Sequence, residues 1–526
     1  MPSTPTTKSQ VQAYQFVLRR MQSALVRRDA VMLNDPMRTH SRATIVGFFL
    51  GMIGMIGFVV WGLLSPAPAV PEAGKIVIGE QSGTVYVVMG NPKKLYPTFN
   101  MASARLLLMA QGGASGGKPS PATVVSDDQL RDVPRGRLTG IPDGPQLLPS
   151  ASQRISNDWA VCDEIGIDRS LPGDLSGINE TSVYAGVPKL GRELANNEAL
   201  LAKSATGKTY LVYRLLDNAN QRNANTVRAE IDAKNSGPVN TALDLVNTTP
   251  RFISEGMLNA IPEVPMLTKP AIEGTDTAPP FEMNNLKVGG VFSTSPASGP
   301  KDFWVVTKTG IQHISPVVAD IIRGSINGNT IQDLGLGKLQ NVPQLKAGDP
   351  GALQVQDYPQ TKVAVLDPAK QSEVACLGWS IKGDGNGRDV HTSVFVDNKL
   401  PAPKADSIQL GTPSPDRGLV NRFYMKPGFA AAVRSVVSKE QFDRGNIQLV
   451  SDRGLRYGVP DVKTAEGLGL DNLQPAPDSI LALLPVGASL NTQDVLATYD
   501  SVPIDKAAKN YPTARPSSAA APPPGK

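Results

Sequence analysis

The sequence has few residues of the kinds that bind metals or act as strong nucleophiles: two cysteines and three histidines among 526 residues. These residues (Cys162, Cys376, His40, His313, His391) are scattered and lack metal-ligand spacing, so no metal site is expected. Phe, Trp and Tyr together make up only 5% of the chain. The 49 glycines and 45 prolines, in contrast, together make up about 18% of the chain, above the usual combined share of about 12%. This composition predicts many turns and short strands.

Most of the chain also has no excess of positive or negative charge, although the net charge of the whole chain is +5. Seven of the 52 basic and two of the 47 acidic residues lie in residues 1–64, which leaves 45 of each sign beyond them. A neutral body offers no electrostatic attraction to a polyanion. No nucleic-acid partner is therefore expected.

One apolar run stands out, because Thr44–Leu64 contains 21 residues without a charge. A helix of about 20 apolar residues spans the hydrocarbon core of a bilayer. Seven basic residues precede this run and only Lys75 follows closely, so the positive-inside rule predicts a cytosolic N-terminus. A cleaved signal peptide is the less favoured alternative, because its apolar region spans about 7–15 residues. We predict a cytosolic basic helical arm over 1–43, a transmembrane helix over 44–64 and an exported remainder.

The arm is predicted to be helical from Ser9 to Leu33. Its apolar residues recur at steps of three and four: Val11, Tyr14, Leu18, Met21 and Leu25. Four arginines lie on the other side: Arg19, Arg20, Arg27 and Arg28. This pattern favours packing against a helix of a partner protein, and binding to the anionic inner leaflet is the alternative. Pro36 is expected to end the helix.

Beyond the span, a strand–turn–strand–helix pattern recurs at irregular spacing, which argues against a solenoid or propeller. The copies are Lys75–Met109, Phe303–Arg323 and Ile447–Leu470, with partial copies at Ala202–Tyr213 and Ser407–Val433. Repeat-like units are expected near residues 75–120, 200–235, 289–340 and 405–475, and a central core from 121–199 and 345–401. A Pro/Ala linker (65–74) should precede this region (75–512), and a disordered Pro/Ala tail (513–526) should follow it.

The two cysteines lie in similar local sequences, because Trp159 is three residues before Cys162 and Trp379 three residues after Cys376. An exported location permits disulfide formation, and we predict that Cys162 and Cys376 form one disulfide. Closure of so long a loop could stabilise the fold by roughly 5 kcal/mol. Two separate buried thiols are the alternative. The predicted fold class is α+β and β-rich, with a single N-terminal transmembrane helix followed by repeat-like units around a disulfide-linked central core.

One segment matches a loose nucleotide-loop pattern, [AG]-x4-G-K-[ST], which ends in Gly207, Lys208 and Thr209. A phosphate-binding loop needs a strand before it and a helix after it. A helix is expected here over 190–203 and a strand over 209–213, so the segment predicts a hairpin turn. Nucleotide binding by these three residues is therefore a weak alternative, and neither ATP nor another cofactor is expected.

The arm contains QAYQFVLRRMQSALVRRD at Gln12–Asp29, followed by MLNDP at Met32–Pro36. These residues resemble the signature of EccB, a family of membrane components of the mycobacterial type VII (ESX) secretion apparatus. The order of arm, span, repeats, paired cysteines and tail is similar to that family over the whole chain.

The resemblance implies a core scaffold subunit in the inner membrane, with most of the chain in the periplasm. Implied partners are EccC, EccD, EccE and the mycosin protease, together with self-association through the periplasmic region. The implied cargo is WXG100, PE and PPE proteins. The family is often described as an ATPase, so nucleotide hydrolysis is the alternative function.

Overall fold

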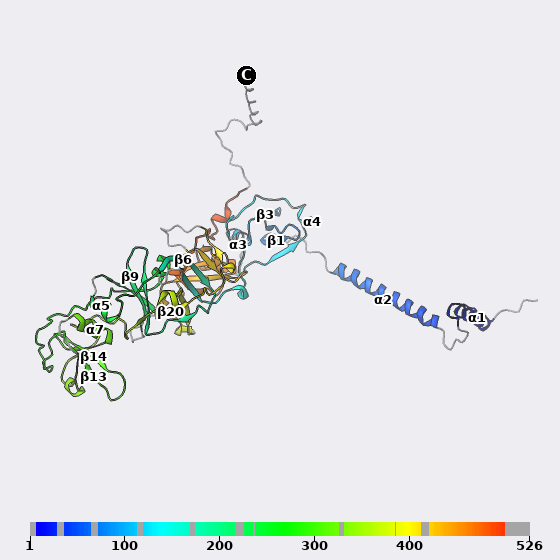
Figure 1. Cartoon of the computed structure of the whole chain (residues 1–526). Coiled ribbons are helices and arrows are strands. Elements are labelled where there is room, and N and C mark those ends of the chain that lie inside the picture. Colours follow the sequence, from blue (N-terminus) through cyan, green and yellow to red (C-terminus); the bar gives the residue numbers. More distant parts are fainter. Residues whose placement is uncertain are drawn as a thin grey trace, which may run out of the picture. The chain divides into compact units, whose positions relative to one another are not determined.

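The computed structural model describes residues 7–28, 36–64, 72–112, 119–168, 174–215, 226–234, 237–325, 331–383, 385–411 and 420–499. The predicted tail and most of the predicted linker lie outside these residues. The chain separates into two compact units, Met1–Ala69 and Val70–Lys526. We call the second unit the body and describe each unit by itself (Figure 1).

The N-terminal unit contains two helices, α1 (Lys8–Arg27) and α2 (Pro36–Leu64). At the start of α1 the backbone N–H of Thr7 donates to Gln10 Oε1 at 3.0 Å, as in a capping box. Arg28 follows α1 with a left-handed φ of 54°. Within α2, Arg42–Leu64 is long and apolar enough to cross a membrane. Pro36 was expected to end a helix, but it begins α2, because proline is tolerated in a first turn where its missing N–H is not needed.

The described residues of the body contain four small units with one topology, each with three antiparallel strands, a helix and a short fourth strand. Unit 1 comprises β1 (Lys75–Gly79), β2 (Val85–Met89), β3 (Lys94–Thr98), α3 (Met101–Ala110) and β4 (Ala122–Val125). Unit 2 comprises β8 (Glu198–Lys203), β9 (Thr209–Arg214), β10 (Thr226–Ile231), α5 (Gly237–Ala242) and β11 (Arg251–Phe252). Unit 3 comprises β13 (Val291–Thr294), β14 (Asp302–Val306), β15 (Ile311–Ile314), α7 (Pro316–Ser325) and β16 (Gln332–Asp333). Unit 4 comprises β23 (Ala430–Val436), β24 (Asn446–Ser451), β25 (Arg456–Val459), α9 (Val462–Leu468) and β26 (Gln474–Pro477).

In every unit the fourth strand pairs in parallel with the first, as in the order β3-β2-β1-β4. Such a parallel return needs a crossover, which the helix provides. Side-chain caps start three of these helices directly after the third strand: Asn100, Ser315 and Asp461 accept bonds from Ser103 N, Val318 N and Thr464 N at 2.8, 3.3 and 2.7 Å. A further parallel segment lies beside the third strand of units 2 and 3: β12 (Glu263–Val264) and β17 (Gln344–Leu345).

The four units form two pairs through their helices. Helix α3 of unit 1 packs against α9 of unit 4, and the two units share one apolar core that includes Leu106 and Leu468. Helix α5 of unit 2 packs against α7 of unit 3 in a second core that includes Val239 and Ile321 (Figure 1). Units 2 and 3, which are adjacent in sequence, therefore form one pair. Units 1 and 4, which come from opposite ends of the body, form the other.

A seven-stranded sheet forms the central core, with the order β21-β22-β6-β5-β19-β20-β7. Its long strands are β5 (Trp159–Asp168), β6 (Asp174–Ala185), β19 (Val374–Lys382) and β20 (Asp389–Asp397). Its short strands are β7 (Arg192–Glu193), β21 (Ile408–Gln409) and β22 (Arg422–Tyr424). One face carries Trp159 and Val161 and packs in one large core with residues of units 2 and 4. The predicted fold class, repeat-like units around a disulfide-linked core, is confirmed.

Two local predictions are wrong, and a third has the correct location in unit 2 but a different alignment. The helix expected over 190–203 is absent, because β7 and β8 occupy that range. The partial copy at 407–433 is not a repeat, because β21 and β22 join the central sheet and unit 4 starts only at Ala430. The partial copy at 202–213 spans β8 and β9, the first two strands of unit 2, whereas the copies at 303–323 and 447–470 span the second and third strands of units 3 and 4.

Candidate functional site

The centre of the body is the disulfide between Cys162 on β5 and Cys376 on β19, whose Cα atoms are 3.9 Å apart. The two cysteines lie directly opposite each other in antiparallel register, as do Trp159 and Trp379. This pairing explains the mirrored order of Trp and Cys in the two segments, because antiparallel strands align residues in opposite chain directions. Both cysteines are fully buried, so the disulfide joins two neighbouring strands of the central sheet from within the core.

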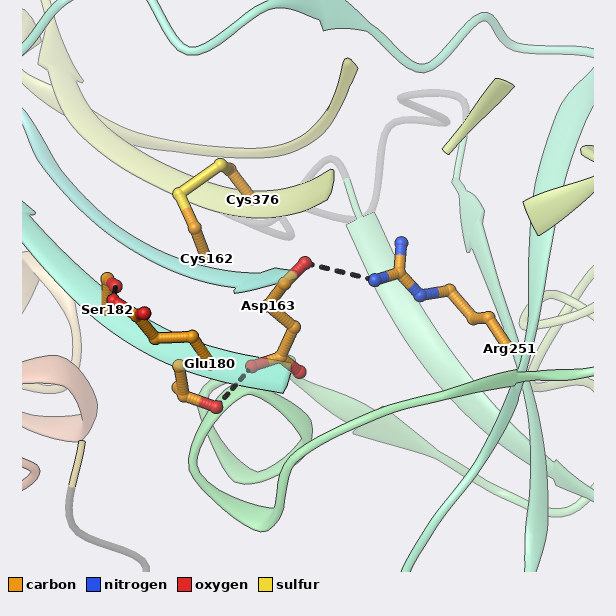
Figure 2. The surroundings of a disulfide bond; sticks show 7 residues. Cys162, Asp163, Glu180, Ser182, Arg251 and Cys376 are labelled. Atoms are coloured by element: carbon orange, nitrogen blue, oxygen red, sulfur yellow. Dashed lines mark hydrogen bonds between the residues drawn. A yellow bond between two sulfur atoms is a disulfide. The ribbon is translucent and has the colours of Figure 1, made fainter. Parts of the chain in front are cut away.

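Asp163 follows Cys162 and faces the opposite side of the sheet, toward unit 2 (Figure 2). Its carboxylate is fully buried and accepts three hydrogen bonds: from Thr181 Oγ1 at 2.8 Å, from Ser254 Oγ at 2.7 Å and from Ser254 N at 2.7 Å. Burial raises the pKa of Asp163, and the bonds from Ser254 and Thr181 oppose this rise. The carboxylate thereby ties β5 and β6 to the start of α6 (Glu255–Ala260).

Arg251 on β11 completes this network from the side of unit 2 (Figure 2). It is 2% exposed and donates to the backbone oxygens of Asp163 at 3.1 Å and Ser372 at 2.9 Å. Burial lowers the pKa of Arg251 to about 10, so the guanidinium stays charged at neutral pH. Since neither charged group is accessible, the pair holds unit 2 on the central sheet and offers no surface for a substrate.

The nucleotide-like residues lie at the hairpin between β8 and β9: Gly207 and Lys208 are in the tight turn, and Thr209 is the first residue of β9. Gly207 has a φ of 85°, and Thr209 pairs with Lys203 in the hairpin. Lys208 Nζ lies 2.8 Å from Glu230 Oε2, and this hydrogen bond and charge raise the pKa of the lysine. A strand, β9, follows the turn, so the helix N-terminus that would face a phosphate in a nucleotide loop is not next in the chain.

The predicted partner-binding side chains of the arm lie on α1. Its apolar members, Tyr14, Leu18, Met21 and Leu25, are 42–82% exposed within the described N-terminal unit. Arg19 and Arg20 belong to the same helix, Arg27 is its last residue and Arg28 follows it. The helix therefore presents an apolar surface together with a basic one.

Asp163, Arg251 and Ser254 were not predicted from the sequence. Asp163 and Arg251 are 88 residues apart, and no local pattern marks either as buried. Among the described residues, no three His, Cys, Asp or Glu side chains lie together as a metal site requires.

The comparisons with known proteins cover almost the whole chain. The model of a family described as type VII secretion system ESX-1, transport TM domain B, matches residues 3–504. A relative from Mycolicibacterium smegmatis, named ESX-3 secretion system ATPase EccB3, is 30% identical over 94% of this chain and 91% of its own length. A relative from Mycobacterium tuberculosis, named ESX-1 secretion system ATPase EccB1, is 26% identical over 96% and 98%.

Solved structures agree with this match. A chain of an intact ESX-5 inner membrane complex aligns with a TM-score of 0.63 at 25% identity, covering 96% of this chain and 98% of that chain. The structure of an EccB3 dimer from the ESX-3 core complex aligns with a TM-score of 0.64 at 27% identity, covering 81% and 100%. Because the family match runs from the arm through the apolar helix and all four units, the chain belongs to the EccB family of type VII secretion components.

Proposed function

We propose that this chain is a membrane-anchored scaffold subunit of an ESX secretion complex, which helps to assemble the periplasmic part of a machine that exports WXG100, PE and PPE proteins. The observation that carries this proposal is the end-to-end similarity to a chain of an intact ESX-5 inner membrane complex. A second similar chain comes from the periplasmic assembly of that complex. The buried centre of the body fits this role, since Asp163 and Arg251 join modules and are inaccessible to a substrate.

In the proposed orientation, α1 lies in the cytosol, α2 crosses the inner membrane once and the body lies in the periplasm. The excess of basic residues before the apolar run supports this orientation. Ser9→Cys on α1 and Lys308→Cys on unit 3 test it by labelling with a membrane-impermeant maleimide, because the native cysteines form a buried disulfide. Only Lys308→Cys should react in intact spheroplasts, and Ser9→Cys should react after permeabilisation. The reverse pattern would invert the proposed topology.

The proposed partners are EccC, EccD, EccE and the mycosin protease, with further contacts between copies of the body. Support for a partner of α1 comes from the exposure of Leu18 and Met21, which are 42% and 57% exposed. Leu18→Ser/Met21→Ser should reduce recovery of the intact complex on native gels, and mass spectrometry would identify the lost subunits. Replacing Arg19, Arg20, Arg27 and Arg28 by Gln should have the same direction of effect. Lys301→Ser/Lys308→Ser in the body is the control, and complexes unaffected by every arm variant would contradict this assignment.

Nucleotide hydrolysis is the second candidate, because the relatives carry ATPase in their names. The residues to test are Lys208 and Thr209. Turnover by the purified full chain should be compared between wild type, Lys208→Ala and the control Lys308→Ala. The scaffold proposal expects no turnover that depends on Lys208, and loss of turnover in Lys208→Ala alone would favour the hydrolase.

A further inference from the structure

One connection crosses a face of the central sheet. Strand β20 is sixth in the sheet order and β21 is first, and residues Asn398–Ser407 join them. Strands lie about 4.8 Å apart, so this connection must span roughly 24 Å. Ten residues reach at most about 33 Å. The connection, which we call the strap, therefore has little slack and must pass over β19, β5, β6 and β22.

The strap covers the disulfide. Its residues Leu400 and Ala402 belong to the same apolar cluster as Cys162 and Cys376, on the sheet face opposite Trp159. Ala402 is buried and both cysteines are fully buried. Leu190 and Phe395 pack in the same cluster from outside the strap. Displacement of the strap would remove Leu400 and Ala402 from this cover.

Charged side chains hold the strap down. Lys404 Nζ lies 2.5 Å from Glu164 Oε2 and 3.4 Å from Glu180 Oε2. These two carboxylates face each other across β5 and β6 and are mostly buried, with 17% and 12% of their side chains exposed. Like charges in opposed positions of a sheet are destabilising. Lys404 neutralises them, so release of the strap leaves two close carboxylates with one cation fewer.

Arg422 on β22 reinforces the same contact. Its Nε lies 2.7 Å from Glu180 Oε1, and its Nη1 donates to the backbone oxygens of Lys404 at 3.3 Å and Ser407 at 3.4 Å. The strap is thus held by the Lys404 side chain through Glu164 and Glu180, and by its backbone through Arg422.

We propose that the strap is a latch, closed by Lys404 on Glu164 and Glu180, that shields the Cys162–Cys376 disulfide from thiol–disulfide exchange. Exchange begins when an external thiolate attacks one sulfur, forms a mixed disulfide and releases the other cysteine as a thiolate. A second thiol then displaces the bound one, so the reductant is oxidised to a disulfide and the protein is left with two thiols. Opening of the strap alone would admit the thiolate without unfolding of the body.

The test compares the rate of disulfide reduction by excess dithiothreitol in the full-length chain, with the new thiols trapped by a mass-shifting maleimide. Lys404→Met keeps the aliphatic stem and removes the charge, and should accelerate reduction about fivefold or more. Lys404→Arg should restore protection to within about twofold of wild type. Lys301→Met is the matched control, because Lys301 forms an ion pair with Asp333 at 2.7 Å in unit 3 and should leave the rate unchanged.

Equal rates in wild type and Lys404→Met would overturn the latch, and so would equal acceleration by Lys404→Met and Lys301→Met. The wild-type protein provides a check without any variant. Reduction through strap opening should depend weakly on low urea concentrations, because little surface is exposed. A rate that rises as steeply with urea as global unfolding would show that the strap gives no separate route, and would also overturn the latch.

Discussion

The units of both pairs in the body share one topology, but different interactions hold each pair together. All strands of units 2 and 3 lie between Cys162 and Cys376, inside a covalent loop with a sequence separation of 214. Unit 1 precedes this loop and unit 4 follows it, so contacts between their side chains must hold them together. Distant segments lose more entropy on closure than adjacent ones. The comparison shows one architecture stabilised by a disulfide in one half and by packing and hydrogen bonds in the other.

The contacts that close units 1 and 4 are specific. Arg105 on α3 donates to the backbone oxygen of Leu468 at 2.5 Å, across 363 residues of sequence. Arg154, which lies between unit 1 and β5, donates to the backbone oxygen of Gly469 at 3.1 Å and pairs with Asp471, and so also holds unit 4. Gly467 permits the close approach of α9 to α3, because a Cβ there would lie 2.2 Å from Met109 Sδ. This pair can therefore be weakened by single substitutions.

The largest effect is expected from removal of the covalent closure. Cys162→Ala/Cys376→Ala makes both pairs depend on packing alone and should lower the free energy of unfolding by about 5 kcal/mol on the chain-entropy model. Urea unfolding of the purified protein measures the change. An unchanged unfolding free energy would mean that the disulfide has no role in stability.

The next largest effect is expected where unit 2 meets the central sheet. Arg251→Met leaves the buried Asp163 without its cationic neighbour and should cost about 3–5 kcal/mol. Asp163→Asn/Arg251→Met removes both charges and should recover part of this loss in the same urea titration. The single variant Asp163→Asn completes the comparison. If the loss of unfolding free energy in the double variant equals the sum of the losses in Arg251→Met and Asp163→Asn, the two groups do not interact.

A smaller effect is expected at the contact between units 1 and 4. Gly467→Val should push α9 away from Met109 and destabilise the protein by about 1–3 kcal/mol. Gly458→Val is the control, because a Cβ at that glycine meets no atom within 4 Å. Limited proteolysis should then cleave within unit 1 or unit 4 before units 2 and 3. Earlier cleavage in units 2 and 3 would show that the pair inside the disulfide loop is the less stable one.

The smallest effect is a pH dependence of the contact between Arg154 and Asp471 of unit 4. The hydrogen bond and charge of Arg154 lower the pKa of Asp471. Stability from this carboxylate is therefore present above the ordinary Asp pKa of about 3.9 and is lost as pH falls through the lowered folded pKa. Wild type should be more stable than Asp471→Asn at neutral pH, and thermal melts should converge in acid. A difference that persists in strong acid would point to a contact that does not depend on charge.

Local patterns in the sequence account for the features that were predicted correctly. The mirrored Trp and Cys residues and the alternating strands of units 1, 3 and 4 are short-range signals, and they indicated a β-rich body around one disulfide. The helix expected over 190–203 failed because Leu194, Leu200 and Leu201 also suit a helical period, whereas tertiary pairing makes Glu198–Lys203 a strand buried on both faces. Two-residue strands such as β11 and β16 exist only through pairing with distant strands.

The buried polar contacts could not be predicted for the same reason. Asp163 and Arg251 meet only after β5 and β11 are in place, and Lys404 reaches Glu164 across 240 residues. The lengths of the intervening segments carry no information on which charges become neighbours. Charge pairs of this kind follow from the topology, and the sequence predicts that topology only as repeat-like units around a core.

The parallel pairing of β8 with β18 (Ala364–Val365) shows how units 2 and 3 are inserted into the rest of the body. Glu198 lies opposite Ala364, so the chain enters units 2 and 3 and leaves them at neighbouring positions, one strand spacing of about 4.8 Å apart. Residues 198–365 are thus an insertion into a host made of the central sheet and units 1 and 4. An insertion exchanged with that of a relative would also have to supply Arg251 and Ser254 to Asp163 and the unit 2 side of the shared apolar core.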